Sequence, residues 1–281
     1  MREVPVQDIT QTVARLCKEA ASTLPSEVTN LIHKAQQTEV SEFGRYALDE
    51  VCENLEIAHR DKMPLCQDTG IVLVFLELGQ EVHITGGDLE QAVNQGIAQG
   101  YTEGYLRKSI VSDPLFRREN TKDNSPGIIY LRMVPGDGLH ITVMPKGAGS
   151  ENMTKLAMLK PAQGIDGVKD FIIHTVASAG GNPCPPTIVG VGIGGNADKA
   201  VQLSKEALRR RAGSHHADPA YAQLEEELLH AINKTGIGPQ GFGGLNTALA
   251  VQIETYPTHI AMLPVAVTLN CYAARHAEAQ L

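Results

Sequence analysis

The near-continuous apolar run IVLVFLEL, residues 71–78, constrains the fold more than any other part of this sequence. It is too short to span a bilayer, and its β-branched and aromatic residues favour a strand that is buried on both faces. The motif PLCQDTG (64–70) comes directly before it, so a thiol, an amide, a carboxylate and a turn glycine stand together at the start of the strand. Because sites are built where loops meet strand ends, we interpret this motif as a candidate site.

The remaining patterns predict an α+β fold with mixed α/β layers, in which an N-terminal helical region precedes a mixed sheet with helices. Apolar residues at helical spacing fill the first part of the chain, to about residue 60. Two strand-like runs, 127–134 and 139–144, flank Pro-Gly-Asp-Gly and predict a hairpin. The turn KGAGSEN is expected to lead into a helix over MTKLAML (153–159), and the loop GIGPQGFGG (236–244) is too rich in glycine to be a mere linker.

Composition and charge exclude several classes of protein. The formal net charge of the 281-residue chain is −8, which argues against a surface for nucleic acid or anionic membranes. The basic cluster Arg209–Arg211 lies near the end of a predicted helix, where it complements the helix dipole. Neither a signal peptide nor a membrane-spanning run is visible, so we expect a soluble, cytoplasmic protein.

The five cysteines are an odd number and form no C-x-x-C pair, which argues against a disulfide framework or a zinc ribbon. Cys17 and Cys52 fall on apolar helical faces and are expected in the core. The other three stand at element boundaries, in PLCQDTG (Cys66), NPCPPT (Cys184) and TLNCYA (Cys271). Three thiolates would leave one position on a metal open, and an open metal is a Lewis acid. Taken by themselves, these positions leave a metal site and three core cysteines about equally open.

Several motifs, in order along nearly the whole chain, resemble the α subunit of the class I iron–sulfur hydro-lyases, the family of two-subunit fumarate hydratases and L-tartrate dehydratases. They are PLCQDTG, KGAGSEN, NPCPPTIVGVGIGG, GIGPQGFGG and the spacing from His259 to Cys271. The resemblance implies one catalytic domain over residues 1–281 and a [4Fe-4S] cluster held by Cys66, Cys184 and Cys271. It also implies a β subunit that supplies a C-terminal domain absent from this chain, in an α2β2 assembly.

The same resemblance implies the substrate-binding residues of a small dicarboxylate site: Gln67, Asp68, Arg107, Gly149 and His259. An arginine suits a carboxylate, and a glycine-rich turn before a helix presents bare N–H groups to an anion. Asp68 is the candidate catalytic residue, which would tune or relay the proton on the adjacent carbon. The segments GYLRKS (104–109) and KGAGSENMTKL resemble the fumarate hydratases, so hydration of fumarate to (S)-malate is expected; the alternative is dehydration of L-tartrate to oxaloacetate.

Plainer interpretations stand beside these roles. Asp68 suits a turn, Arg107 suits the end of a helix predicted from Asp88 to about residue 107, and His259 suits a structural role. The stretch VGVGIGGNADKA (189–200) also suggests the glycine turn of an NAD-dependent oxidoreductase, although its spacing departs from G-x-G-x-x-G. A third hypothesis is a non-catalytic subunit that binds or regulates a partner.

Overall fold

The structure is a computed structural model that describes residues 2–281 and divides into two compact units. The first unit comprises the chain up to Pro25 together with Leu55–Ala148 and Arg275–Leu281, and the second comprises Ser26–Asn54 and Gly149–Ala274. Its mixed sheets and helices confirm the predicted α+β class. Within residues 2–281, every helix falls short of the length and apolarity needed to cross a bilayer.

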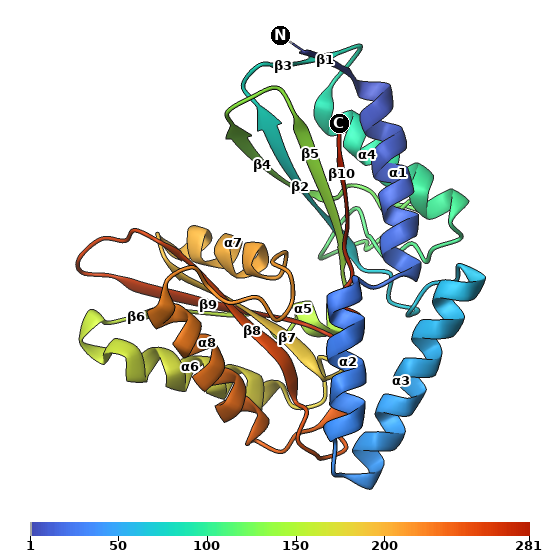
Figure 1. Cartoon of the computed structure of the whole chain (residues 1–281). Helices are drawn as coiled ribbons and strands as arrows, with labels where there is room; N and C mark the ends of the chain where they lie inside the picture. The colour runs from blue at the N-terminus through green and yellow to red at the C-terminus, as the bar shows by residue number, and fades with distance from the viewer. Residues whose placement is uncertain (1) are drawn as a thin grey trace. The chain divides into compact units, whose positions relative to one another are not determined.

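The first unit is built around the predicted apolar strand. Its elements are β1 (Arg2–Pro5), α1 (Val6–Ser22), β2 (Ile71–Gly79), β3 (Val82–Thr85), α4 (Leu89–Glu103), β4 (Ile128–Val134), β5 (Leu139–Lys146) and β10 (Ala277–Gln280). The sheet order β10-β5-β2-β4 confirms that β2 is an interior strand. Helices α1 and α4 cover one face of this sheet, where Val72, Val74 and Leu76 pack into the core (Figure 1).

The predicted hairpin between residues 127 and 144 is wrong, although both of its strands exist. Strand β2 lies between them and pairs with β4 in parallel and with β5 antiparallel. The connecting turn instead wraps the end of β2, since Gly79 N donates to Gly138 O at 2.8 Å and Glu81 N donates to Gly136 O at 3.0 Å. The physical reason is that β2 is apolar on both faces, so burial favours it at the centre of the sheet over a place at the edge.

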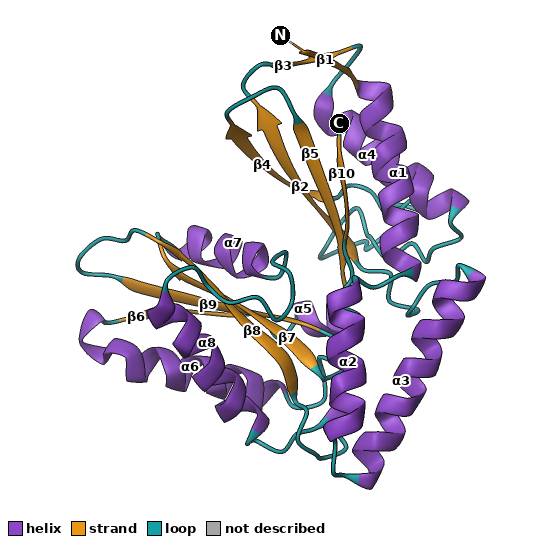
Figure 2. Cartoon of the chain, in the orientation of Figure 1, coloured by secondary structure: helices purple, strands orange, loops and turns teal. Residues whose placement is uncertain are grey.

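The second unit holds another mixed sheet, in the order β6-β9-β7-β8. Its elements are α2 (Ser26–Thr38), α5 (Ala148–Glu151), β6 (Lys155–Leu159), α6 (Gly164–Ala179), β7 (Thr187–Gly194), α7 (Ala197–Ala207), α8 (Pro219–Asn233), β8 (Ala248–Tyr256) and β9 (Leu263–Asn270), while α3 (Glu42–Asp61) runs from this unit into the first. Helices α6 and α8 pack on one face of the sheet and α7 on the other (Figure 2).

The predicted helix over residues 153–159 is also wrong, because this segment forms the edge strand β6. Lys155–Leu159 pairs antiparallel with β9, which supplies a ready partner for its backbone. A short apolar run has no periodicity long enough to separate a strand from a helix, and here the neighbouring strand decides.

The glycines of residues 189–200 have a packing role. Gly190 and Gly192 lie inside β7, and a Cβ on either would meet the backbone of α7, at Ser204 O and Ala200 O. In a dinucleotide site the glycines stand in the turn itself, where the backbone must approach a pyrophosphate. Gly190 and Gly192 in the pattern that suggested NAD binding are therefore explained by the close approach of a helix to a strand.

Candidate functional site

The Cys66 loop, residues 64–70, leads into β2 and is shaped by a glycine. Gly70 has a φ of +75°, and a Cβ at this position would lie 2.6 Å from the carbonyl oxygen of Lys146. The half-buried Cys66 accepts a hydrogen bond at Sγ from the backbone N of Asp68, at 3.4 Å. Hydrogen bonds from main-chain N–H groups to sulfur are typical of cysteines that hold iron–sulfur clusters, so this turn suits a cysteine that holds a metal.

Both carboxylate oxygens of Asp68 accept hydrogen bonds from the backbone. Oδ1 accepts from Gly70 N at 3.0 Å, and Oδ2 accepts from Ala148 N at 2.7 Å. Asp68 therefore closes the turn, as its plainer interpretation predicts, and also ties the loop to the residue that precedes Gly149 in the chain. Each carboxylate oxygen has a second lone pair, so these bonds leave room for a substrate contact.

Three buried side chains that the sequence analysis missed fix the backbone carbonyls of the Cys66 loop. Tyr101 Oη donates to the carbonyl oxygen of Thr69 at 2.6 Å, and Asn124 Nδ2 donates to that of Gly70 at 3.0 Å. Arg275, whose side chain is 2% exposed, donates from Nη2 to the carbonyl oxygen of Asp68. Burial raises the pKa of the Tyr101 phenol, which keeps it a donor.

Arg107 lies beside this loop, beyond the end of α4. The helix ends at Glu103, so Arg107 is not the helix-end cation of the plainer interpretation. Its backbone oxygen accepts from Thr69 Oγ1 at 2.6 Å, while its side chain and that of Gln67 are exposed. The first unit thus brings the segment of Cys66, Gln67 and Asp68 together with the backbone of Arg107.

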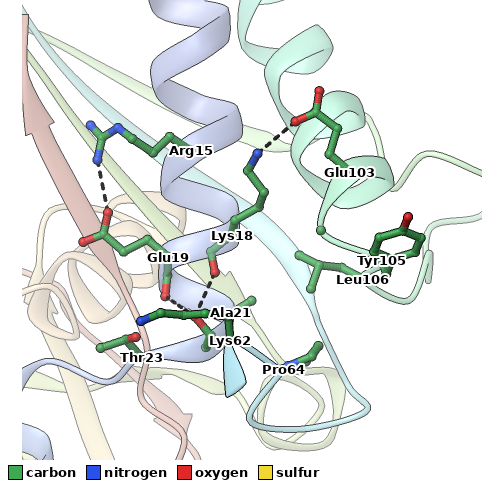
Figure 3. A pocket seen from close by; sticks show the side chains of 12 residues that line it. Arg15, Lys18, Glu19, Ala21, Thr23, Lys62, Pro64, Glu103, Tyr105 and Leu106 are labelled. Atoms are coloured by element: carbon green, nitrogen blue, oxygen red, sulfur yellow. Dashed lines mark hydrogen bonds and ion pairs between the residues drawn. The ribbon is translucent and has the colours of Figure 1, made fainter. Parts of the chain in front are cut away.

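A groove of about 480 Å³ opens on the first unit, between the last turns of α1 and the segments 62–64 and 104–106 (Figure 3). Its charged walls are largely paired with one another. Arg15 lies 3.1 Å from Glu19, and Lys18 lies 2.8 Å from Glu103. The predicted site residues do not line it, although its walls lead along the chain into the Cys66 loop and into Arg107.

In the second unit, Cys184 and Cys271 meet at one end of the sheet. Cys184 precedes β7 and Cys271 follows β9, and these antiparallel strands pair Ile188 with Asn270. The backbone N of Tyr272 donates to Cys184 O at 3.2 Å, which joins the two segments directly. Gly149 belongs to the same end, because a Cβ on it would lie 3.3 Å from Asn182 O.

The Cys184 loop, residues 181–187, is held in a strained conformation by the glycine-rich loop, residues 236–244. Cys184 and Gln240 both have a φ of 53°, a left-handed conformation that is uncommon outside glycine. The two loops join at Pro185 O, which accepts from Gln240 N at 2.7 Å and from Gln240 Nε2 at 2.8 Å. Strain of this kind concentrates at functional sites, so the glycine-rich loop supports a candidate site.

His259 lies away from this cluster. It is exposed in the connection between β8 and β9, where its Nδ1 accepts from Ala261 N at 3.1 Å. This connection precedes β9, whereas Cys271 follows it. Eight strand residues at about 3.3 Å each make β9 roughly 25 Å long, with His259 before one end of it and Cys271 directly after the other. The second unit therefore brings Cys184, Cys271 and Gly149 together but leaves His259 at the opposite end of the sheet.

The cysteines divide by exposure into two classes. Cys17 and Cys52 are buried as predicted, and burial raises the pKa of the Cys17 thiol to about 12. Cys184 is exposed, and Cys66 and Cys271 are half-buried, so all three loop thiols can be reached. Within residues 2–281, no three His, Cys, Asp or Glu side chains gather as a metal-binding group. The three loop cysteines nevertheless have the chemistry of an iron–sulfur ligand set: soft donors in turns, one of them accepting an N–H···S bond.

Comparison with known proteins covers almost the whole chain. The sequence model of the fumarate hydratase (Fumerase) family matches residues 10–280. The chain is 44% identical over 275 residues to a protein of Methanocaldococcus jannaschii named "Putative L(+)-tartrate dehydratase subunit alpha", and the match covers 96% of each chain. It is 29% identical over 276 residues to the "L(+)-tartrate dehydratase subunit alpha" of Escherichia coli (strain K12), a match that covers 98% of this chain and 91% of the relative.

Proposed function

Because the chain belongs to the fumarate hydratase (Fumerase) family, we propose that it is the α subunit of a two-subunit hydro-lyase acting on a four-carbon hydroxy dicarboxylate. The first candidate substrate is L-tartrate, dehydrated to oxaloacetate. The observation that carries this choice is the match over nearly the full length to relatives named L(+)-tartrate dehydratase subunit alpha. It reverses the order of the two substrates in the sequence analysis, since similarity over the whole chain outweighs two short motifs.

Fumarate, hydrated to (S)-malate, is the second candidate. The family description and the segments GYLRKS and KGAGSEN favour it. Both reactions relate a hydroxyl on one carbon to a proton on the next, between two carboxylates. The same binding groups therefore serve either substrate, and the additional hydroxyl of tartrate is what a pocket would have to distinguish.

The cofactor in this proposal is a [4Fe-4S] cluster held by Cys66, Cys184 and Cys271. When bound by three cysteines, such a cluster supplies one open iron that acts as a Lewis acid toward the hydroxyl. The division of the cysteines supports the proposal, because the two buried thiols are unavailable and the three loop thiols are accessible.

The chain's own residues would bind and orient the substrate. The exposed guanidinium of Arg107 can form two parallel hydrogen bonds with one carboxylate, and Gln67 can donate to another oxygen. The backbone at Gly149 would contact the substrate where a side chain would be in the way. Asp68, already fixed by two backbone N–H groups, would accept or return the proton of the adjacent carbon.

His259 has to reach the substrate differently, because it lies at the opposite end of the sheet from Cys184 and Cys271. We propose that it serves the site of a second copy of the chain, which supports an α2β2 assembly over a single αβ pair. The β subunit is the partner that the names of the relatives imply. None of the five cysteines within residues 2–281 is joined in a disulfide, which suits a reducing compartment and supports a cytoplasmic location.

The test is an anaerobic assay of the chain co-expressed with its β subunit and reconstituted with iron and sulfide. Oxaloacetate from L-tartrate and (S)-malate from fumarate are measured side by side, as kcat/KM for each substrate. A preference for L-tartrate supports the first candidate, and a preference for fumarate supports the second. A Cys184→Ala complex that kept full activity on both would contradict the catalytic role and favour a non-catalytic subunit.

A further inference from the structure

We propose that Glu39 is a positioning residue for Cys184, acting through the glycine-rich loop. The inference rests on the proposed function only in giving Cys184 its role as a ligand. The contacts that carry it all lie within the second unit. Glu39 follows α2 and stands far from Cys184 in the sequence, so neither motif nor spacing predicts the connection.

Glu39 is a buried carboxylate whose acceptor capacity is used by two separate segments. Its side chain is 4% exposed, and Oε1 accepts from the backbone N of Val40 at 2.9 Å and of Ser41 at 3.0 Å. From the far side, Leu245 N and Asn246 N donate to it at 3.0 Å, and Asn246 Nδ2 donates at 2.8 Å. A charged acceptor with several N–H donors makes the stronger class of hydrogen bond.

The glycine-rich loop is shaped to admit this carboxylate. Gly244 has a φ of +140°, and a Cβ there would collide with Glu39 Oε1. Gly44 approaches from the other side, where a Cβ would lie 3.0 Å from Glu39 Cγ. Glycine at both positions thus leaves the space that the Glu39 side chain occupies, as expected if this side chain is held in one position.

The segment that Glu39 holds is joined to the Cys184 loop at two points. At one end, Gln240 donates both its backbone N and its Nε2 to Pro185 O, next to Cys184. At the other end, Thr247, which follows Asn246, accepts at its carbonyl oxygen from Thr187 N at 2.9 Å. The residues directly after Cys184 are therefore held at two points by a segment that Glu39 binds at Leu245 and Asn246.

Glu225 provides a matched control in the same unit. It is 3% exposed and also binds several donors, since it accepts from Arg210 Nη1 at 2.8 Å, from Ile253 N at 2.8 Å and from His216 N at 2.9 Å. Glu225 itself lies on α8, and its donors lie on β8 and in the segment after α7, apart from the Cys184 loop and the glycine-rich loop. A change at Glu225 reports what the loss of a buried carboxylate does to the unit in general.

The first measurement is hydrogen exchange on the full chain, comparing Glu39→Gln and Glu225→Gln with the unchanged protein. We expect exchange at residues 181–187 and 236–244 to rise roughly five- to tenfold in Glu39→Gln, as the loss of one or two net hydrogen bonds gives. In Glu225→Gln these segments should exchange as before. The milder Asn246→Ala, which removes one donor to Glu39, keeps the test usable if Glu39→Gln fails to fold. Loosening confined to residues 245–246, or equal in both carboxylate variants, would overturn the inference.

The second measurement is the rate of iron loss after anaerobic reconstitution. Glu39→Gln should lose iron several-fold faster than Glu225→Gln. Unaltered exchange at 181–187 sinks the positioning role even if the unchanged protein binds iron. If Glu39→Gln exchanges faster at 181–187 but the unchanged protein never takes up iron, the positioning role is supported and the proposed function is contradicted. The two failures are therefore distinguishable.

Discussion

The two cysteine loops at the ends of the two sheets are fixed by different means. In the Cys66 loop, the buried side chains Tyr101, Asn124 and Arg275 donate to successive backbone carbonyls. In the Cys184 loop, where Cys184 has a left-handed backbone conformation, Gln240 donates to Pro185 O from its backbone N and its Nε2, and Thr187 N donates to Thr247 O. The first loop therefore depends on distant side chains, and the second on a neighbouring backbone and on the carboxylate that anchors it. This difference predicts which kinds of substitution each loop tolerates.

The largest expected effect tests whether the two loops share one function. Cys66→Ala and Cys184→Ala should each remove iron binding and lower activity more than ~100-fold, since even residues that only support a metal ligand cost 10–100-fold. Iron per chain and anaerobic activity with the β subunit are the measurements. Cys52→Ala is the control. Because Cys52 is buried in the core, the protein with this substitution should retain its iron. If Cys66→Ala retained its iron, the two loops would not share one metal-binding function.

The next effect tests the shape of the Cys66 loop. Gly70→Ala places a Cβ 2.6 Å from Lys146 O at a φ of +75°, so both a steric and a conformational cost apply. We expect the free energy of unfolding to fall by about 3 kcal/mol, measured by urea denaturation. Gly136→Ala is the matched control, because its φ is +97° but a Cβ there meets nothing within 4 Å. Its expected cost is about 1 kcal/mol, so equal losses in the two variants would contradict the steric explanation.

A smaller effect tests the anchor of the Cys184 loop through pH. Burial alone raises the pKa of Glu39, but hydrogen bonds from Ser41, Leu245 and Asn246 outweigh it and hold the pKa below its ordinary value of 4.5. The ionised carboxylate therefore stabilises the folded chain above pH 4.5, and this contribution is lost as the pH falls through the lowered pKa.

Glu39→Gln should accordingly lower the free energy of unfolding by about 1–3 kcal/mol at neutral pH, because it leaves buried donors poorly matched. Near pH 4 and below, the difference from the unchanged protein should shrink. Urea denaturation at both values is the measurement. A difference that stays constant with pH would show that the charge of Glu39 contributes little to anchoring the loop.

The sequence predicts the helices, the central strand and the loop cysteines, but not the strand partners or the buried residues that support the cysteine loops. Long periodic segments and the apolar run of β2 are found correctly, because burial alone determines them. The pairing of β4 and the strand β6 are missed, since both depend on which neighbour is available. The loop cysteines stand out through glycine and proline. Their supports Glu39, Asn124 and Arg275 do not, because a polar residue gives no local sign that it will be buried against a distant backbone.

The smallest expected effect on stability concerns His259, which neither cysteine loop touches. His259→Ala should change the free energy of unfolding by no more than about 0.5 kcal/mol, because the side chain is exposed, and should leave iron binding intact. If His259 serves the site of a second copy, the variant loses activity without losing iron. Co-expressing His259→Ala with Cys184→Ala chains should then restore part of the activity, since a mixed assembly contains sites with an intact cysteine set and an intact histidine. Two inactive parents that remain inactive together would place the function of His259 within its own chain, although β9, roughly 25 Å long, lies between it and Cys271.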